Sequence, residues 1–571
     1  MKKLFFLAML AGLVSIANGQ GFLRTSGTKI VNEKGENVVL RGMGLGGWML
    51  QEGYMLRLNG TNPQFSIRNR IEKLIGPEQT QQFYDAWLKN FITKADIDSM
   101  KRWGFNSVRL PMHYNLYTLA VDKEPDSTKQ TWLEKGFQLT DSLLSWCRAN
   151  KMYLILDLHA APGGQGNDLN IADRDSTKPS LWQSPANQAK TIALWTKLAA
   201  RYKNEPWIGA YDIINEPNWG FEDLSNDKNG LKESSNKPLR ELMVKITQAI
   251  RAVDKNHIVI IEGNGWGNNY KGIFPLWDNN MAISFHKYWN HNDVKSIQHM
   301  LDARIQNNAP VWVGETGENS NTWFADAVQL LESNNIGWCW WPLKKLGNNN
   351  PLEIRSNDKY NRLVEHWNSR GNAVAPSADD ARTALMELAA STNNRYNNIC
   401  RDVIDALIRQ PFNASTVPYA NMQAGTIKAV DYDLGRNGIA YYDKDTGNYR
   451  VSTGRNSAGN RGRMYRNDGV DIYKDSTNVL YVGNIEDGEW LQYTVNVDRK
   501  GEYDLKIVAE ASGNVSVLVD GKPVVENAAI SSSNWQTQSL GKLNLDKGKH
   551  VIKLRADKGG FNFKELLLSK P

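Results

Sequence analysis

The feature that most constrains this chain is a repeated alternation of short apolar runs and longer amphipathic segments between Gly21 and Trp367. The short runs predict strands, and the longer segments predict helices because their apolar residues recur with helical spacing. Strands that are apolar throughout and separated by helices favour parallel pairing with both faces buried. The expected strands are Val38–Gly42, Ser107–Pro111, Tyr153–His159, Ile208–Asn215, His257–Glu262, Ala282–His286, Val311–Glu315 and Ile336–Trp341.

Eight such units in about 350 residues indicate a (β/α)8 barrel, the TIM barrel fold. A doubly wound open sheet is the alternative, because hydrophobic runs alone do not distinguish a closed sheet from an open one. The expected helices between the strands include Ala95–Trp103, Leu133–Asn150, Ala186–Tyr202, Arg240–Val253 and Asn321–Asn334.

Polar and aromatic side chains stand at the ends of these apolar runs. In a barrel the chemistry takes place at the C-terminal ends of the strands. A single residue of this kind is usually a solvated loop residue, but residues at the ends of most strands converge on one mouth if the barrel closes. They are Arg109, His159, Asn215, Glu216, Glu262, His286, Tyr288, Glu315 and Trp341.

Two of these residues, Glu216 and Glu315, form the kind of pair that glycosidic bond cleavage requires. They follow the fourth and seventh expected strands, which lie nearly opposite each other in a ring of eight. One carboxyl group can protonate the leaving oxygen while the other attacks the anomeric carbon. We expect Arg109 and Tyr288 to donate hydrogen bonds to Glu315 and to keep it ionised.

The other strand-end residues suit a sugar bound in this mouth. Asn215 carries the amide needed to bond a sugar 2-hydroxyl, and His159 and His286 can bond hydroxyls or tune the acid. Trp341 can stack beneath the sugar at the cleavage point. The chemistry requires neither a metal nor a cofactor, and we predict neither.

The strand-end segments resemble those of glycoside hydrolase family 5, the cellulase family A. Any one tripeptide is weak, but seven segments in the family's order are specific. The segments are Arg41–Gly47, Trp103–Pro111, Leu156–His159, Tyr211–Pro217, His286–Tyr288, Gly314–Thr316 and Gly337–Lys344. The resemblance covers about 350 residues and implies a (β/α)8 fold, with Glu216 as acid/base and Glu315 as nucleophile. It implies that the catalytic subsite is lined by Arg109, His159, Asn215, His286, Tyr288 and Trp341.

Within this family, three segments look most like the β-1,3-glucanase branch, namely LGGWMLQEG, FITKADIDSMKRWGFNSVRLP and DLHAAPGGQ. The match then fails in residues 54–90 and 166–188. Loops of this kind decide whether the mouth is an open cleft or a blind pocket, so the sequence leaves endo and exo action open. The alternative substrates within the same family are β-1,4-glucan, mannan and xyloglucan.

The sequence pattern changes after the expected barrel. Helical patterns at Ala378–Ser391 and Arg395–Arg409 are followed by Pro411–Thr416, which marks a linker. From about Thr426, short alternating stretches separated by Gly, Asp and Asn turns predict a β-sandwich of the jelly-roll kind.

The sandwich region resembles a family 6 carbohydrate-binding module in residues 464–473, 482–497, 548–554 and 561–568. The resemblance implies that Tyr465 and Trp535 clamp a sugar ring and that Asn562 bonds its hydroxyls. A packing role is the alternative for Trp535. The family's early acidic pair is replaced by Lys428-Ala429-Val430, which leaves calcium binding open.

The N-terminus has the form of a secretory signal peptide. Two lysines precede the apolar run Leu4–Ile16, which is too short to span a bilayer, and small residues follow it before Gln20. No cysteine lies near the expected cleavage site before Gln20, so attachment to a membrane as a lipoprotein is not expected. We expect a secreted or periplasmic protein without a stable membrane anchor.

The charge of the chain argues against a nucleic-acid-binding protein. The net charge of +7 falls to +5 without Lys2 and Lys3 (66 basic minus 61 acidic residues), and no Lys/Arg block stands out, so nucleic acid is not an expected partner. The odd number of cysteines, Cys147, Cys339 and Cys400, leaves at least one without an intrachain partner.

The sequence therefore predicts a secreted retaining glycoside hydrolase whose partner is a β-glucan polysaccharide. We expect a signal peptide at 1–19, a catalytic barrel at 20–370, a helical extension and linker at 371–425, and a β-sandwich carbohydrate-binding module at 426–571. A non-catalytic secreted polysaccharide-binding protein and a transglycosylase are the alternatives, and the oligomeric state stays open.

Overall fold

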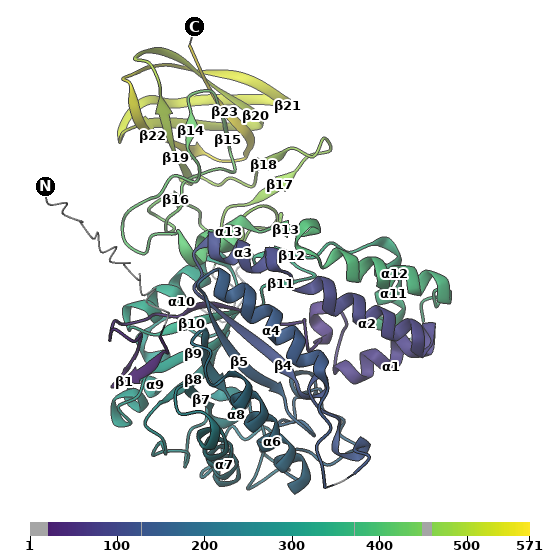
Figure 1. Ribbon diagram of the computed structural model, residues 1–571. Coiled ribbons are helices and arrows are strands. Elements are labelled where there is room, and N and C mark those ends of the chain that lie inside the picture. Colours follow the sequence, from purple (N-terminus) through teal and green to yellow (C-terminus); the bar gives the residue numbers. More distant parts are fainter. Residues whose placement is uncertain (1–20, 127, 371, 448–458, 571) are drawn as a thin grey trace, which may run out of the picture.

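The computed structural model describes residues 21–126, 128–370, 372–447 and 459–570. The expected signal peptide at 1–19 lies outside these residues. The described chain forms a barrel and, beside it, a C-terminal all-β domain (Figure 1). No helix in the described ranges is long and apolar enough to cross a membrane.

Eight parallel strands close into a barrel in the order β10-β3-β4-β5-β6-β7-β8-β9. Closure confirms the expected fold and excludes the open sheet. The strands are almost fully buried because the barrel interior lies on one face and helices cover the other. They are β3 Arg41–Gly44, β4 Ser107–His113, β5 Tyr153–Ala160, β6 Ile208–Asp212, β7 Ile258–Glu262, β8 Met281–Lys287, β9 Val311–Gly317 and β10 Gly337–Trp341.

Amphipathic helices cover the outside of the barrel (Figure 1). In α7 the buried residues Leu239, Leu242, Met243, Ile246 and Ile250 recur at helical spacing and form the face turned to the strands. The barrel helices are α1 Gln64–Ile75, α2 Pro77–Phe91, α3 Lys94–Trp103, α4 Glu134–Ala149, α5 Leu169–Ala172, α6 Pro185–Tyr202, α7 Lys237–Val253, α8 Asn264–Gly267, α9 Val294–Gln306, α10 Asn321–Ser333 and α11 Asp358–Asn368.

An N-terminal hairpin closes the bottom of the barrel. It consists of β1 (Arg24–Ser26) and β2 (Lys29–Val31). Leu23 and Ile30 pack in one cluster with residues near the starts of the strands, among them Tyr153. Because this end is filled with apolar side chains, the opposite end, where the strands finish, is left for the polar residues.

Two further helices pack on the outside of the barrel. Helix α12 (Ala378–Ser391) lies against α2, and α13 (Arg401–Ile408) lies against α10. The second helix begins later than expected, because residues 394–396 form a separate 3-10 turn.

The C-terminal β domain is a curled sheet with its own core. Its main path runs in the order β14-β19-β22-β20-β23-β18-β17. Two strands are much longer than the short ones expected, since β20 has 19 residues and β21 has 24. Register shifts near Leu505 and Ala509 interrupt their pairing. The strands are β14 Met422–Gln423, β15 Thr426–Lys428, β16 Tyr441–Tyr442, β17 Ile472–Lys474, β18 Leu480–Val482, β19 Trp490–Val497, β20 Gly501–Val519, β21 Lys522–Leu545, β22 Gly548–Lys558 and β23 Phe561–Ser569.

The β domain contacts the barrel directly. The Asp402 carboxylate in α13 accepts hydrogen bonds from the Asn321 side chain (2.7 Å) and from the Asn467 backbone N–H (3.0 Å). Asn321 begins α10 of the barrel, and Asn467 precedes β17 of the β domain. Burial raises the pKa of Asp402 to about 6, although the two donors oppose this shift.

Replacing Asp402 with Asn is expected to stabilise the protein at pH 7. The folded pKa lies above the unfolded one, so the ionised carboxylate costs stability that accumulates as the pH rises from about 3.8 to about 6. An amide oxygen can accept the same two hydrogen bonds without charge. We expect the variant to gain on the order of 1–3 kcal/mol at pH 7 and almost nothing near pH 4, measured by denaturant unfolding at both pH values. A variant less stable than the wild type at pH 7 would contradict this.

Candidate active site

Two buried glutamates face each other at the C-terminal ends of the barrel strands. Glu315 lies in β9, and Glu216 lies in the turn after β6. The two residues are 4% and 6% exposed. Carboxylate oxygens of both, and a ring nitrogen of His286, lie within 4.8 Å of one another. All three residues line a cavity of about 540 Å³, a size typical of a small-ligand site.

Glu315 is held by two donors, one from β4 across the barrel and one from the segment after the adjacent strand β8. Arg109 Nη1 in β4 lies 2.5 Å from Oε1, and the Tyr288 hydroxyl after β8 lies 3.3 Å from Oε2. One donor on each oxygen fixes the plane of the carboxylate. The structure therefore brings Arg109, Tyr288 and Glu315 together, the three residues that the sequence analysis placed in one hydrogen-bonded group.

Arg109 is the buried centre of this network. Its Nη2 donates to Asp212 Oδ2 at 2.8 Å, and its guanidinium lies 3.2 Å from both Asp157 and Glu262. The positions of both aspartates inside strands predict a structural role, which fits their contacts with the guanidinium. Burial by itself would lower the pKa of Arg109, but the surrounding negative charges raise it well above its ordinary value.

Glu216 is positioned by β7 and β8. Its carboxylate lies 2.6 Å from His286 Nδ1, and its backbone N–H donates to Glu262 Oε2 at 2.7 Å. Glu262 Oε1 also lies 3.0 Å from His286 Nε2. Glu216 has a φ of 41°, a strained conformation that this bridge holds in place. Burial would lower the pKa of His286, but the charges of these two glutamates and of Glu315 raise it well above its ordinary value.

His159 and Trp341 form one side of the cavity. Their rings stack with centroids 5.1 Å apart and planes 6° apart. His159 Nδ1 lies 2.8 Å from Asp157 Oδ2, and burial lowers the pKa of His159 to about 3, so the ring is neutral. Asn215 accepts from Arg109 at 2.7 Å and lies 3.4 Å from His159 Nε2. The structure thus gathers all eight barrel site residues of the sequence prediction at one mouth.

Several cavity-lining residues were missed by sequence reasoning. Glu262 lies behind the cavity and is fully buried; it was noticed as a strand-end residue, but its bridging contacts could not be predicted from the sequence. Trp289 carried a signal, because it directly follows Tyr288 at a strand end. The other missed lining residues include Glu52, Tyr54, Trp266, Asn268 and Glu318.

Glu216, His286 and Glu315 are close enough to hold a cation in principle. One contact and one electrostatic effect argue against this use. His286 Nδ1 already lies 2.6 Å from the Glu216 carboxylate, and the surrounding carboxylates raise the pKa of the ring, which favours its protonated form. A metal ligand must be neutral imidazole with a free lone pair. The arrangement suits proton transfer better than metal binding.

The three residues predicted to bind sugar in the β domain have different neighbours. Tyr465 is 39% exposed, and its hydroxyl bonds to Asp431 and Tyr419. The Trp535 ring packs against Tyr481 (5.1 Å) and lies under the Lys564 ammonium group (4.0 Å).

Asn562 donates to Glu510 on β20 at 3.1 Å. Asn562 Oδ1 also lies close to Gly483, which follows Tyr481 and β18. Asn562 and Trp535 therefore lie around the same strand, whereas the contacts of Tyr465 run toward Tyr419. The clamp of Tyr465 and Trp535 stays a prediction.

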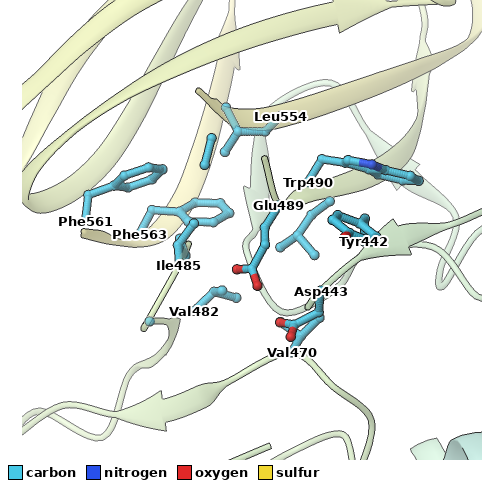
Figure 2. A pocket seen from close by; sticks show the side chains of 13 residues that line it. Tyr442, Asp443, Val470, Val482, Ile485, Glu489, Trp490, Leu554, Phe561 and Phe563 are labelled. Atoms are coloured by element: carbon cyan, nitrogen blue, oxygen red, sulfur yellow. The ribbon is translucent and has the colours of Figure 1, made fainter. Parts of the chain in front are cut away.

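A separate pocket lies inside the β domain. Figure 2 shows the carboxylates of Asp443 and Glu489 pointing into a space lined by aromatic and aliphatic side chains. Burial and the charge of Glu489 raise the pKa of Asp443 to about 8. The volume of about 20 Å³ admits roughly one water molecule, so this pocket cannot hold a sugar ring.

A closed parallel barrel with two opposed buried carboxyl groups at its strand ends defines a glycoside hydrolase. Residues 68–347 match the cellulase family (glycosyl hydrolase family 5), and residues 463–570 match the carbohydrate binding module of family 6. The chain belongs to glycoside hydrolase family 5 and carries a family 6 carbohydrate-binding module.

Three curated relatives show how far this similarity extends. A β-xylosidase from Phanerodontia chrysosporium is 31% identical over 62% of this chain and 78% of its own length. Endoglucanase C from Acetivibrio thermocellus is 28% identical over 49% of this chain and 91% of its own length. A glucan 1,3-β-glucosidase from Candida oleophila is 26% identical over 45% of this chain and 57% of its own length.

Proposed function

We propose that this glycosidase is a retaining β-glucanase that cleaves β-glucosidic bonds in a β-1,3- or β-1,4-glucan. The observation that carries the proposal is the distance between Glu216 and Glu315, whose carboxylate oxygens approach within 4.8 Å. Retaining enzymes hold their two carboxyl groups about 5–5.5 Å apart, and inverting enzymes hold them about 6.5–9.5 Å apart to admit a water molecule.

In the first step, Glu315 attacks the anomeric carbon and forms a covalent glycosyl ester. The bond from that carbon to the leaving oxygen breaks, and Glu216 transfers its proton to this oxygen. In the second step, Glu216 takes a proton from water, whose oxygen attacks the same carbon and releases Glu315. Two inversions at one carbon give net retention.

The contacts around the pair support these roles. Arg109 and Tyr288 hold the nucleophile with one donor on each oxygen. His286 Nδ1 lies 2.6 Å from the Glu216 carboxylate and can share the proton that Glu216 gives and takes back. Trp341 supplies a flat apolar surface for the sugar ring.

The relatives bear on the substrate class. An endoglucanase and a glucan 1,3-β-glucosidase are among the similar proteins, which favours a glucan. A β-xylosidase is also among them, so xylo-oligosaccharides belong in the test. We further propose that the protein is secreted through its N-terminal segment, because a carbohydrate-binding module serves an extracellular polymer.

The test is a product panel read by proton NMR. β-1,3-, β-1,4- and mixed-linkage glucans, mannan, xyloglucan and xylo-oligosaccharides are incubated with the enzyme, and the anomer formed first is recorded. We expect the β anomer first, from a β-glucan. The α anomer as first product would refute double displacement, and cleavage of mannan or xylo-oligosaccharides alone would refute the glucan assignment.

A prediction follows for the β domain. Trp535 is a half-buried aromatic on β21, and we expect Trp535→Ala to lower binding and activity on insoluble glucan by about 10-fold, since stacking desolvates an apolar sugar face. Hydrolysis of short soluble oligosaccharides should stay unchanged. Val524→Ala, at a 43% exposed position on the same strand, is the control. Equal binding by both variants in a pull-down would assign Trp535 to packing against Tyr481 and Lys564.

A further inference from the structure

A buried lysine without an acidic partner lies beside the catalytic residues. Lys287 ends β8, between His286 and Tyr288, and it is 1% exposed. No carboxylate in the described ranges forms an ion pair with it, and Asp293, just before α9, acts on it only through its charge. Because lysine is rarely buried unless an acidic group pairs with it, this position requires another reason.

The amine of Lys287 binds the segment that follows β8. Nζ donates to the side-chain oxygen of Asn290 and, at 2.8 Å, to the carbonyl of His291. Nζ also lies 5.1 Å from the centroid of the Trp323 ring on α10. One buried side chain therefore ties residues three and four positions further along the chain to the end of the strand.

Two more hydrogen bonds join the same segment to α10. The Trp323 indole N–H donates to the Asn290 carbonyl at 2.9 Å, and the Asn292 side chain donates to the Trp323 carbonyl at 3.0 Å. Trp323 is fully buried, so it gives these contacts a fixed base. Residues 289–291 are exposed, so hydrogen bonds rather than burial hold them.

Trp289 is the residue that this segment presents to the catalytic cavity. It lines the cavity and is 47% exposed. Its φ of 53° is strained for a residue with a side chain, and such a conformation persists only where the surrounding contacts hold it. Lys287 precedes Trp289 and binds the two residues that follow it, so its contacts enclose the strained position.

An indole held at the wall of this cavity offers a flat surface to a sugar ring. The apolar C–H face of a pyranose loses contact with water when it stacks on such a ring. Binding is stronger when the ring is already ordered, because ordering a loop and a side chain costs binding free energy.

The backbone of Lys287 is fixed independently of its amine. The hydroxyl of Thr316, which follows the nucleophile Glu315, donates to the Lys287 carbonyl at 2.6 Å. Lys287 also pairs with Thr316 in the register of β8 and β9. A change of the Lys287 side chain should therefore leave β8 in place, with His286 and Tyr288 on either side.

We infer that Lys287 is a positioning residue that holds Trp289 in the wall of the catalytic cavity, where its indole binds a sugar of the substrate. The inference rests on the proposed function. Lys287 acts through Trp289 and not on the two glutamates, so its loss should weaken substrate binding more than the chemical step.

The first test is a double-mutant cycle of Lys287→Met and Trp289→Ala on β-1,3- and β-1,4-linked glucose tetrasaccharides. Trp289→Ala should lower kcat/KM by about 10-fold, since the stacking surface is lost. Lys287→Met should lower it by about fivefold, mainly through a higher KM. The double variant should lose about 10-fold and no more, because Lys287 then has no indole left to position.

The rescue and control variants use the same assay. Lys287→Gln, whose amide keeps N–H donors, should recover part of the loss. Lys295→Met, at an exposed position of α9, should match the wild type. A loss of about 50-fold in the double variant, or either single variant within about twofold of the wild type, would overturn the inference. The anomer formed first is read in the same reactions, so such a result with retention leaves the proposed function intact.

The second test requires no substrate. A buried ammonium group without a counter-charge costs stability, and burial lowers the pKa of Lys287 to about 7, so this cost is fully present at pH 6. Methionine fills the same space without charge, and the exposed Asn290 and His291 can bond to water instead. Lys287→Met should therefore unfold at a higher urea concentration than the wild type at pH 6, and Lys295→Met at the same concentration. A lower midpoint for Lys287→Met would assign the lysine to holding the fold together and overturn the positioning role.

Discussion

Replacing Glu315 with Gln is expected to lower kcat on β-glucan by at least about 10⁴-fold, because an amide cannot form the glycosyl ester. The change keeps the size of the side chain and its contact with Tyr288. It also removes one negative charge beside Arg109, which remains paired with two buried aspartates. Folding should therefore survive, and the loss should lie in the chemical step, measured by single-turnover kinetics.

Rescue by azide, an added nucleophile, is the control for the variants at Glu315. In Glu315→Ala an added azide ion can attack the anomeric carbon in place of the carboxylate and give an α-glycosyl azide. Glu241→Gln, at an exposed position of α7, should keep wild-type activity. Substantial activity of Glu315→Gln without an added nucleophile would refute the assignment of the nucleophile.

Replacing Glu216 with Ala is expected to slow the hydrolysis of some substrates much more than others, depending on their leaving groups. Natural glucans need a proton on the leaving oxygen, so their hydrolysis should fall by about 10²–10⁴-fold. A 2,4-dinitrophenyl β-glucoside needs no protonation, so its ester should still form at nearly the wild-type rate and then accumulate, since no base activates water. A pre-steady-state burst measures this directly.

The stereochemistry of rescue distinguishes the two glutamates. Azide added to Glu216→Ala attacks the glycosyl ester on Glu315 and should give the β-glycosyl azide, the opposite anomer to that expected from Glu315→Ala. Equal losses on glucan and on the dinitrophenyl glycoside would contradict an acid/base role for Glu216. The α-azide from this variant would also contradict it.

The barrel and its pair of glutamates could be predicted from the sequence because their signals are local. A parallel strand buried on both faces is apolar along its whole length, so a polar residue at its end is conspicuous. His159 and Glu315 each stand near the end of such a run, whereas Arg109 is a charged residue inside β4. Once the strands are counted, the symmetry of the barrel brings these ends to one mouth.

The network behind the pair could not be predicted in the same way. Glu262 binds the backbone of Glu216 through one oxygen and faces both His286 and Arg109 through the other. These partners come from three other strands, and their contacts depend on strand register and side-chain direction. Periodicity reports only which face of a strand is buried.

The contacts between loops could not be predicted from the sequence for a related reason. The segments around Asn62 and Asn170 are polar and irregular, and they are joined by a hydrogen bond across 108 positions of the chain. In the β domain, likewise, Tyr465 and Trp535 were grouped by analogy, but their rings contact different neighbours. Such pairings leave no mark on local composition.

The sequence by itself determined the barrel, the all-β domain and the positions of Glu216 and Glu315, since burial imposes a pattern on every strand and helix. Only the tertiary structure decided how close the two carboxylates lie, how His286 contacts both Glu216 and Glu262, and which residues line the cavity around them. Distances, electrostatic fields and loop contacts arise between residues far apart in the chain, and they exist only after the elements have packed.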